Sequence, residues 1–189
     1  MEEGKLSKKD IKIVIAAHKP YRMPEDTMYV PLHVGAEGKK NPDGTPLDLG
    51  YQKDNEGDNI SAKNPYYCEL TGIYYAWKNI PAEYLGLVHY RRYFKGKNKS
   101  KDPFACIVTE PEMEKIFETH RIVVPKKRKY YIETLYSHYA HTHYAEHLDC
   151  VREIIGEQCP DYLNSYDKVI KQTSGCFFVL HSSLHLIQR

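Results

Sequence analysis

Two short apolar runs, each followed at once by cationic side chains, most constrain what this chain can fold into. One covers residues 11–17 and leads into His18-Lys19, and the other covers residues 84–90 and leads into Arg91-Arg92. Apolar runs of this length predict strands that are buried in a sheet. A helical pattern separates the two runs, and this alternation indicates an α/β fold with a mixed, mostly parallel sheet flanked by helices.

The rest of the chain continues the alternation. We expect further strands over residues 29–35, 104–108, 121–125 and 175–180, and helices over 110–119, 134–158 and 162–171. Residues 36–59 are rich in Gly, Asn, Asp, Pro and Lys, which predicts a long loop, and loops of this length are commonly functional or disordered. Pro31 lacks a backbone donor, so its strand belongs at a sheet edge or at a strand start.

The helix after this loop has the clearest pattern. Its apolar side chains recur at helical spacing and predict one amphipathic helix: Tyr66, Leu70, Ile73, Tyr74 and Trp77. We expect the helix to begin at Ser61, a favourable N-cap residue, and to end before Pro81.

The length of 189 residues suits one domain, and no internal repeat is visible. We expect a polar tail over residues 1–10 and a single domain over residues 11–189. The content of 41% hydrophobic and 28% charged residues excludes a disordered chain. The five cysteines are odd in number and lack a C-x-x-C pair, which argues against a disulfide framework or structural zinc.

The N-terminal residues lack the apolar stretch of a signal peptide, and no run reaches the ~20 apolar residues of a membrane span. We therefore expect a soluble, cytoplasmic protein. The net charge of +2 gives no reason to expect a nucleic-acid partner. Basic residues cluster over 91–101 and 126–129, which suits a phosphate-bearing small molecule or an anionic membrane face. The 17 tyrosines suit half-polar sugar pockets or simply cap the edge of a core, and composition leaves both open.

The two cationic strand ends are the first candidate site, because ligands of open α/β sheets bind beyond the carboxyl ends of the strands. The candidate residues there are His18, Lys19, His89, Arg91 and Arg92. Paired arginines bind phosphate or carboxylate groups with bidentate hydrogen bonds. The alternative is that these arginines form salt bridges with Asp54, Asp58 or Glu69.

The second candidate is the junction between the long loop and the helix, residues 58–64. A helix N-terminus can bind an anion through its free backbone N–H groups, and this one has Ser61, Lys63 and Asn64 beside it. Simple N-capping by Ser61 explains the same residues equally well.

The third candidate is a histidine-rich segment. His143 and His147 are four residues apart, a spacing that would put two metal ligands on one face of a helix. Tyr144 follows His143 where an H-E-x-x-H motif needs Glu, so a zincin is excluded, and a solvated helix is favoured over a metal site. The chain also lacks P-loop, G-x-G-x-x-G, G-x-S-x-G and D-x-D motifs, and we assign no metal ligands.

Four segments, in this order, resemble the DUF4422 family. They are residues 13–21 (IVIAAHKPY), 57–64 (GDNISAKN), 67–79 (YCELTGIYYAWKN) and 86–94 (GLVHYRRYF), within a likeness that extends from about residue 11 to 170. That family occurs in bacterial capsule, exopolysaccharide and lipopolysaccharide O-antigen loci, and is regarded as a glycosyltransferase family of GT-A type. The resemblance therefore implies a GT-A-like fold and dependence on a nucleotide sugar.

The resemblance also implies a donor site, residue by residue. His18 and Lys19 would lie at the nucleotide end of the first strand. Six further residues would line the donor site: Asp58, Asn59, Ser61, Lys63, Asn64 and Glu69. Three more, at the end of the 84–90 strand, stand where other GT-A enzymes keep metal-binding acids: His89, Arg91 and Arg92. His143 matches a histidine in a later helix of the family.

The resemblance implies transfer of galactofuranose or another hexose from a nucleotide diphosphate donor, expected to be a UDP-sugar, to a surface polysaccharide or lipid-linked glycan. In that case Arg91 and Arg92 would stabilise the departing diphosphate. His89, Asp58 or Glu69 would act as the catalytic base, and geometry chooses among them. Assistance by Mn²⁺ or Mg²⁺ and peripheral contact with the cytoplasmic face of the inner membrane stay open.

Family members continue with an Asn-Met-containing strand and an aromatic-rich helix, whereas residues 173–189 here lack both. We therefore expect an incomplete acceptor side. This motivates a second hypothesis, a non-catalytic relative that binds a nucleotide sugar or a glycan. A third, a metal hydrolase, would require zinc on the histidines of the third candidate, namely His138, His141, His143 and His147.

Overall fold

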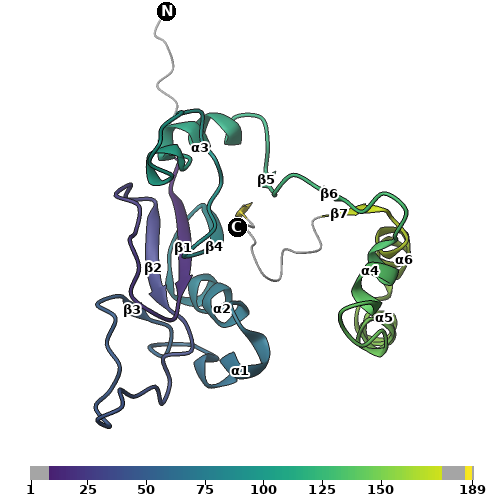
Figure 1. Ribbon diagram of the computed structural model, residues 1–189, viewed down its shortest axis with the longest axis horizontal. Helices are drawn as coiled ribbons and strands as arrows, with labels where there is room; N and C mark the ends of the chain where they lie inside the picture. Colours follow the sequence, from purple (N-terminus) through teal and green to yellow (C-terminus); the bar gives the residue numbers. More distant parts are fainter. Residues whose placement is uncertain (1–8, 176–185, 189) are drawn as a thin grey trace, which may run out of the picture. The chain divides into compact units, whose positions relative to one another are not determined.

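The computed structural model describes residues 9–175 and 186–188 (Figure 1). These residues belong to two compact units, one that runs to Val124 and includes the last strand, and a second over Pro125–Val179. We expected one domain over residues 11–189. No composition shift or linker signal near residue 125 marks the division in the sequence.

The first unit is built on a six-stranded sheet. Four strands run parallel in the order β3-β2-β1-β4, and β8 then pairs antiparallel with both β4 and β5. The strand bounds are Ile11–Ala17 (β1), Tyr29–His33 (β2), Gln52–Lys53 (β3), Tyr84–His89 (β4), Ile122–Val123 (β5) and Leu186–Gln188 (β8). The predicted mixed, mostly parallel α/β sheet is confirmed.

Both faces of this sheet are covered, which explains why its central strands are apolar except for Lys12 in β1 and His89 in β4. On one face, Ile13 and Ile15 of β1 belong to a core with Met113 and Phe117 of helix α3 (Glu110–Phe117). On the other face, Val14 packs in a second core with residues of helix α2 (Leu70–Asn79). The predicted strands over 11–17 and 84–90 and the helix over 110–119 thus agree with the structure.

Pro31 lies in β2 where its missing donor is tolerated. The short strand β3 pairs only with Leu32 and His33, so β2 has no partner on that side at Pro31. The edge position expected from the sequence is therefore correct for this residue.

The helix expected over residues 61–79 is instead three pieces. A 3-10 turn covers Ser61–Lys63, helix α1 covers Asn64–Tyr67, and α2 begins at Leu70 after Cys68, whose φ is 48°. The expected apolar face is also wrong, since Tyr66 is 87% exposed and Trp77 53% exposed. α2 instead buries Thr71, Gly72, Tyr75 and Ala76. Gly72 lies so close to the end of β2 that an added Cβ would stand 2.8 Å from a methyl group of Val34, the residue after this strand.

Residues 104–108 form no strand, contrary to expectation. Phe104–Cys106 make a 3-10 turn that follows Pro103, and Ile107 forms only an isolated bridge with Lys95. Proline has a fixed φ that suits the start of a helical turn, and this local preference prevails over the apolar composition of the segment.

The second unit is mainly helical (Figure 1). A two-stranded antiparallel ladder joins β6 (Arg128–Lys129) to β7 (Ser174–Gly175), and three helices lie between them in sequence. These helices are α4 (Leu135–Ala140), α5 (Glu146–Gln158) and α6 (Leu163–Ile170). The single helix expected over 134–158 is therefore interrupted between α4 and α5. Residues 176–180 of the last expected strand lie outside the described residues.

No helix within the described residues is long and apolar enough to cross a membrane.

Candidate functional site

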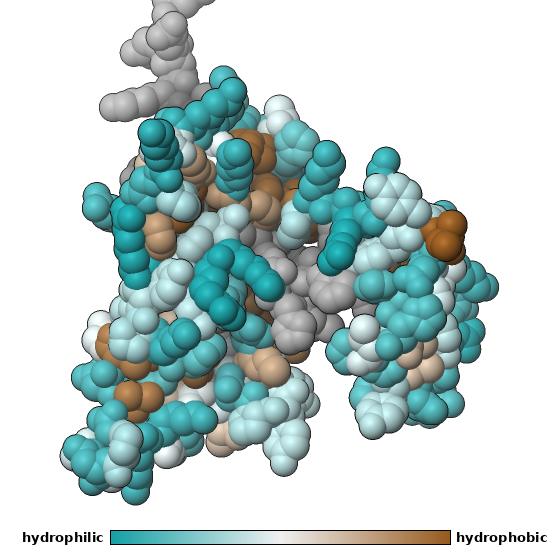
Figure 2. Space-filling model, viewed as in Figure 1, coloured by the Kyte–Doolittle hydropathy of each residue, from teal (hydrophilic) through white to brown (hydrophobic). Residues whose placement is uncertain are grey.

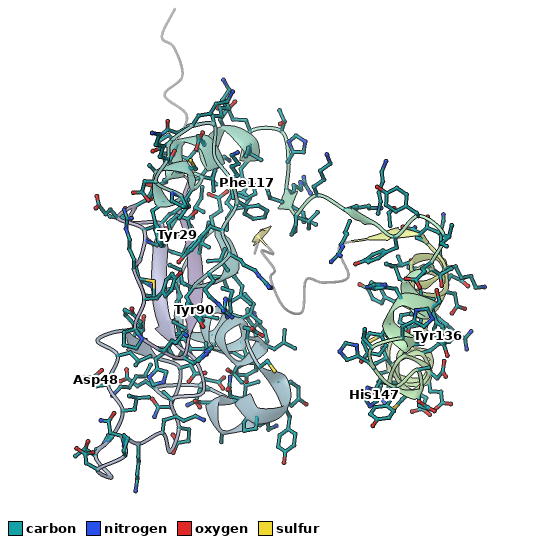
Figure 3. All side chains as sticks on the ribbon, in the orientation of Figure 1. Tyr29, Asp48, Tyr90, Phe117, Tyr136 and His147 are labelled. Atoms are coloured by element: carbon teal, nitrogen blue, oxygen red, sulfur yellow. The ribbon has the colours of Figure 1, made fainter. Side chains whose placement is uncertain are left out.

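The carboxyl ends of β1 and β4 meet at one edge of the sheet. Their parallel register pairs Ala16 with His89, so the residues that follow each strand emerge side by side. The ring centroids of His18 and His89 are 6.3 Å apart, and the Tyr90 ring lies 5.2 Å from His18 and 4.2 Å from His89. Figure 3 shows Tyr90 at this end of the sheet and Phe117 at the opposite end.

His89 is held in a defined state by the tight turn that follows β4. Its side chain is 9% exposed, and its Nδ1 atom accepts a hydrogen bond from the Arg91 backbone N–H at 3.3 Å. Burial lowers the pKa of His89 to about 4; Glu69 opposes this shift, whereas Arg91 adds to it. At neutral pH the imidazole is therefore uncharged, and an Nδ1 that accepts implies a proton on Nε2.

Glu69 supplies negative charge to this group of histidines. It stands directly before α2 and raises the pKa of both His18 and His89, so its carboxylate is near both rings. The pKa of His18 nevertheless falls, first because of partial burial and then because of the charges on Lys19 and Arg91. The edge of the sheet thus combines one carboxylate with several cations.

The cations gather around the Tyr90 ring. The Lys19 ammonium lies 5.8 Å from its centroid, and the Arg91 guanidinium carbon lies 5.2 Å from it. Within the described residues no ion pair joins Arg91 to a carboxylate, which removes the predicted alternative of a salt bridge for this arginine. Arg92 donates its backbone N–H to the carbonyl of His89 at 2.9 Å.

An aromatic pocket of about 480 Å³ adjoins these cations. It is lined by Tyr21, Tyr90, Arg91, Tyr93 and Phe104, among others. Tyr21 packs edge-on against Tyr90 at 5.1 Å, and Tyr93 lies 5.8 Å from Phe104. The volume is within the usual range for small-molecule sites. Sequence reasoning did not find Tyr21, Tyr93 or Phe104 as site residues, although the high tyrosine count hinted at such a pocket.

Asp54 organises the long loop from a fully buried position. Its two carboxylate oxygens accept hydrogen bonds from the backbone N–H groups of Gly35 and Ala36 and from the hydroxyls of Ser61 and Thr71. Ser61 is therefore a structural residue with 1% exposure, and its expected N-cap role is wrong, since Ile60 precedes the 3-10 turn without a side-chain bond. Nothing in the sequence pattern distinguished Asp54 as this centre.

The other residues of the 58–64 junction are also bonded internally. Asn59 accepts from the Ser61 N–H at 3.1 Å, and Asn64 donates to the Cys68 carbonyl at 2.7 Å. The turn and helix that follow are only three and four residues long, so this junction is not the open helix N-terminus that was one of the two alternatives for it. Lys63 is exposed.

Asp58 is drawn toward the second half of α2. It accepts a hydrogen bond from the Tyr74 hydroxyl at 3.0 Å and pairs with the Lys78 ammonium at 3.8 Å. Glu69, in contrast, stands before the first residue of α2. The two carboxylates that sequence reasoning placed together thus belong to opposite ends of one helix.

The histidines of the second unit do not form the expected helical pair. His143 lies between α4 and α5 and stacks on Tyr139 at 4.5 Å, whereas His147 belongs to α5 (Figure 3). The Glu133 carboxylate contacts the Nδ1 atoms of two histidines, His138 at 2.9 Å and His141 at 2.7 Å. In the part of the chain that the structure describes, no three His, Cys, Asp or Glu side chains are grouped so as to hold a metal ion.

The parallel sheet, its cationic edge and the aromatic pocket beside it define an α/β protein with a candidate ligand site beyond its strand ends. The chain belongs to the DUF4422 family, a domain of unknown function whose profile matches residues 12–182. The family assignment from the four sequence segments is thereby confirmed.

Among solved structures, the chain is similar to the apo structure of WbbM, a bifunctional glycosyltransferase. The TM-score is 0.79 with 26% sequence identity over 95% of this chain. The chain spans 34% of the length of WbbM, about one third. No functionally curated protein matches it. The likeness confirms the predicted α/β fold of glycosyltransferase type.

Proposed function

We propose that this chain is a glycosyltransferase unit that binds a nucleotide diphosphate sugar at the carboxyl ends of β1 and β4. The similarity to a glycosyltransferase structure supports a transferase fold. The observation that carries the proposal is the position of Lys19 and Arg91 around Tyr90, beside an aromatic pocket. Fixed cations suit a diphosphate, and aromatic faces suit a nucleobase.

In this proposal the pocket takes the base and the strand ends take the diphosphate. Tyr21 and Phe104, which line the pocket, would contact the base, for which we propose uracil, while Lys19, Arg91 and Arg92 would neutralise the phosphates. The donated sugar would be galactofuranose or another hexose, and the acceptor a surface polysaccharide or lipid-linked glycan. Action at the cytoplasmic face of the inner membrane belongs to the same proposal.

Among the three candidate bases, the contacts favour Glu69. Asp58 is engaged by Tyr74 and Lys78, and the Nδ1 lone pair of His89 is engaged by the Arg91 N–H. Glu69 would take the proton of the acceptor hydroxyl while the oxygen of that hydroxyl bonds to the anomeric carbon. The bond from that carbon to the diphosphate breaks, and the diphosphate leaves with the electron pair. His89 would donate an Nε2–H hydrogen bond to a donor oxygen.

The side chains at this edge of the sheet do not suit a divalent metal ion. Mg²⁺ and Mn²⁺ prefer several oxygen ligands, whereas this edge has the Glu69 carboxylate near the two histidines and the cations Lys19 and Arg91 around Tyr90. We therefore propose that fixed cations stabilise the leaving group. Transfer should proceed equally well with EDTA and with added Mn²⁺. A strict requirement for either metal would contradict this part of the proposal.

A thermal-shift titration with UDP and UDP-hexoses tests the donor site. A ligand that binds only the folded state raises the free energy of unfolding by about 2.7 kcal/mol when its concentration is a hundred times its Kd. Arg91→Ala should remove most of this stabilisation, whereas Lys97→Ala, an exposed cation outside the site, should preserve it. Absence of a shift with every nucleotide would overturn the proposal.

Radiolabelled donor turnover separates the transferase from a non-catalytic binding relative. Glu69→Gln should retain the thermal shift and lower transfer or donor hydrolysis by about a hundredfold or more. Binding by the wild-type chain without any turnover would favour the non-catalytic alternative.

A further inference from the structure

One turn in the second unit presents two large apolar side chains to solvent. The Glu133 N–H donates to the Tyr130 carbonyl at 3.2 Å, and this places Tyr131 and Ile132 at the turn centre. Their side chains are 83% and 95% exposed. Central turn positions ordinarily hold Gly, Pro, Asn or Asp. Tyr131 also has a φ of 61°, which non-glycine residues adopt uncommonly.

Packing on both sides holds this turn in place. Tyr130 is buried, donates its N–H to the Thr173 carbonyl at 2.8 Å and lies against the His138 ring at 4.2 Å. Leu135, on the other side, is 1% exposed and donates its N–H to Gln172 at 2.9 Å. The two apolar side chains therefore project from a fixed base.

Cations precede the turn directly. Lys126, Lys127 and Lys129 are exposed, and none of them forms an ion pair with another described residue. Arg128 is also exposed, and its guanidinium lies 5.5 Å from the Tyr130 ring. We call residues 126–132 the basic-apolar turn. Figure 2 shows a strongly hydrophobic spot on an otherwise hydrophilic face, at the end of the second unit where β6 leads into α4.

We propose that the basic-apolar turn docks the protein on the anionic surface of a lipid bilayer. Lysines next to anionic headgroups gain electrostatic attraction, and a neighbouring apolar side chain gains by entering the interfacial layer. A soluble polyanion would explain the lysines alone, whereas the two exposed apolar side chains call for an apolar phase. The proposal concerns the second unit and does not depend on the donor site of the first.

Residues 95–101 provide a matched control. Lys97, Lys99 and Lys101 are also exposed, but they alternate with Asn98 and Ser100 rather than with apolar residues. If charge alone drives docking, neutralising either set should have the same effect.

Sedimentation with phosphatidylcholine vesicles, with or without phosphatidylglycerol, tests the proposal on the full chain. We expect binding only to the anionic vesicles. The triple change Lys126→Ala, Lys127→Ala and Lys129→Ala should lower the partition coefficient roughly a hundredfold, about fivefold per lysine. Ile132→Asp should lower it about tenfold or more. The triple alanine change at Lys97, Lys99 and Lys101 should alter it less than twofold.

A fluorescent probe at the turn gives a second measurement that does not rely on a loss of binding. Ile132→Trp in a Trp77→Phe background puts the single indole of the chain at the turn. Its emission should shift to the blue with anionic vesicles and stay unchanged with neutral ones.

Three results would overturn the proposal: no binding to anionic vesicles, equal loss from both lysine sets, or an Ile132→Asp variant that binds as the wild type does. The turn would instead be a polyanion site if the wild type and Ile132→Asp bound vesicles with the same affinity and also bound soluble polyphosphate with that affinity.

Discussion

Asp54 illustrates how a single buried carboxylate can order a loop that has almost no regular structure. Its oxygens accept hydrogen bonds from two backbone N–H groups and two hydroxyls, which join the end of β2, the 3-10 turn at Ser61 and the start of α2. The loop therefore has a fixed path beside the candidate site, although its composition alone suggests mobility.

Asp54→Asn should destabilise the protein by about 2–4 kcal/mol, because an amide cannot accept all four hydrogen bonds and leaves buried donors unsatisfied. Urea unfolding measures the change. Asp43→Asn is the matched control, since Asp43 also accepts from a neighbouring threonine but lies fully exposed, and its unfolding midpoint should stay at the wild-type value. An unchanged midpoint for Asp54→Asn would contradict the central role of this carboxylate.

His89 should make stability depend on pH. Its pKa is about 4 in the folded protein and 6.5 without burial, so between these values the unfolded chain binds more protons. The free energy of unfolding therefore falls as the pH drops from 6.5 toward about 4, by at most about 1.4 kcal/mol per pH unit from this residue. His89→Gln should flatten this slope in urea titrations.

Above about pH 7.5 His89 is neutral in both the folded and the unfolded protein. The free energies of unfolding of the wild type and of His89→Gln should therefore change with pH in parallel there. An identical slope for the two proteins between pH 4 and 6.5 would show that His89 does not resist protonation.

Sequence reasoning located the strand-end residues but not the residues that complete the site. His18, Lys19, His89 and Arg91 follow strands whose apolar pattern is plain, and parallel strands bring their carboxyl ends to one edge. Tyr21 and Phe104 meet in the pocket only because two loops far apart in sequence close on each other, and no local pattern encodes that closure.

At the scale of elements, the sequence patterns of the apolar runs and of the 110–119 segment predicted β1, β4 and α3 well. α3 carries its own start signal, a capping box between Thr109 and Glu112. α2 was predicted with the wrong face toward the core, because the helical spacing of its apolar side chains suggested that Trp77 and Leu70 are buried. Close approach of the backbone at Gly72 decides the orientation instead, and such tertiary contact is not encoded in helical periodicity.

Gly72→Ala should therefore destabilise the first unit by about 1–3 kcal/mol, despite the better helix propensity of alanine, because the new methyl group overlaps Val34. Gly156→Ala in α5 is the matched control. Its Cβ would meet no atom nearer than 3.9 Å, so the substitution should stabilise its helix by about 0.5–1 kcal/mol. Chemical unfolding followed by circular dichroism compares the two, and a stabilising Gly72→Ala would contradict the close packing.

At the scale of the whole molecule, the two units differ in how much apolar surface they bury. The buried apolar residues of the second unit are few among those described, namely Tyr130, Leu135, Leu148 and Ile170. The first unit has two continuous cores on either side of its sheet. Local opening requires less free energy where fewer buried contacts must break.

Hydrogen exchange should therefore distinguish the units. Amides of α5 should exchange at least about tenfold faster than those of β1 and β4 under native conditions, through openings that leave the sheet intact. Mass spectrometry of peptic peptides resolves the two regions. Equal protection in both would mean that the units open only together.

The placement of β8 has a consequence for synthesis. This strand lies between β4 and β5 in the sheet, yet β5 ends at Val123 and β8 begins only at Leu186. β4 ends at His89, so at ribosomal rates of about 5–20 residues per second it is complete roughly 5–19 seconds before the neighbour that covers its hydrogen-bonding edge. An uncovered strand edge is a template for pairing with other chains. The nascent protein therefore passes through an interval in which its main sheet is assembled but open, and in which a chaperone or slow dilution should improve its yield most.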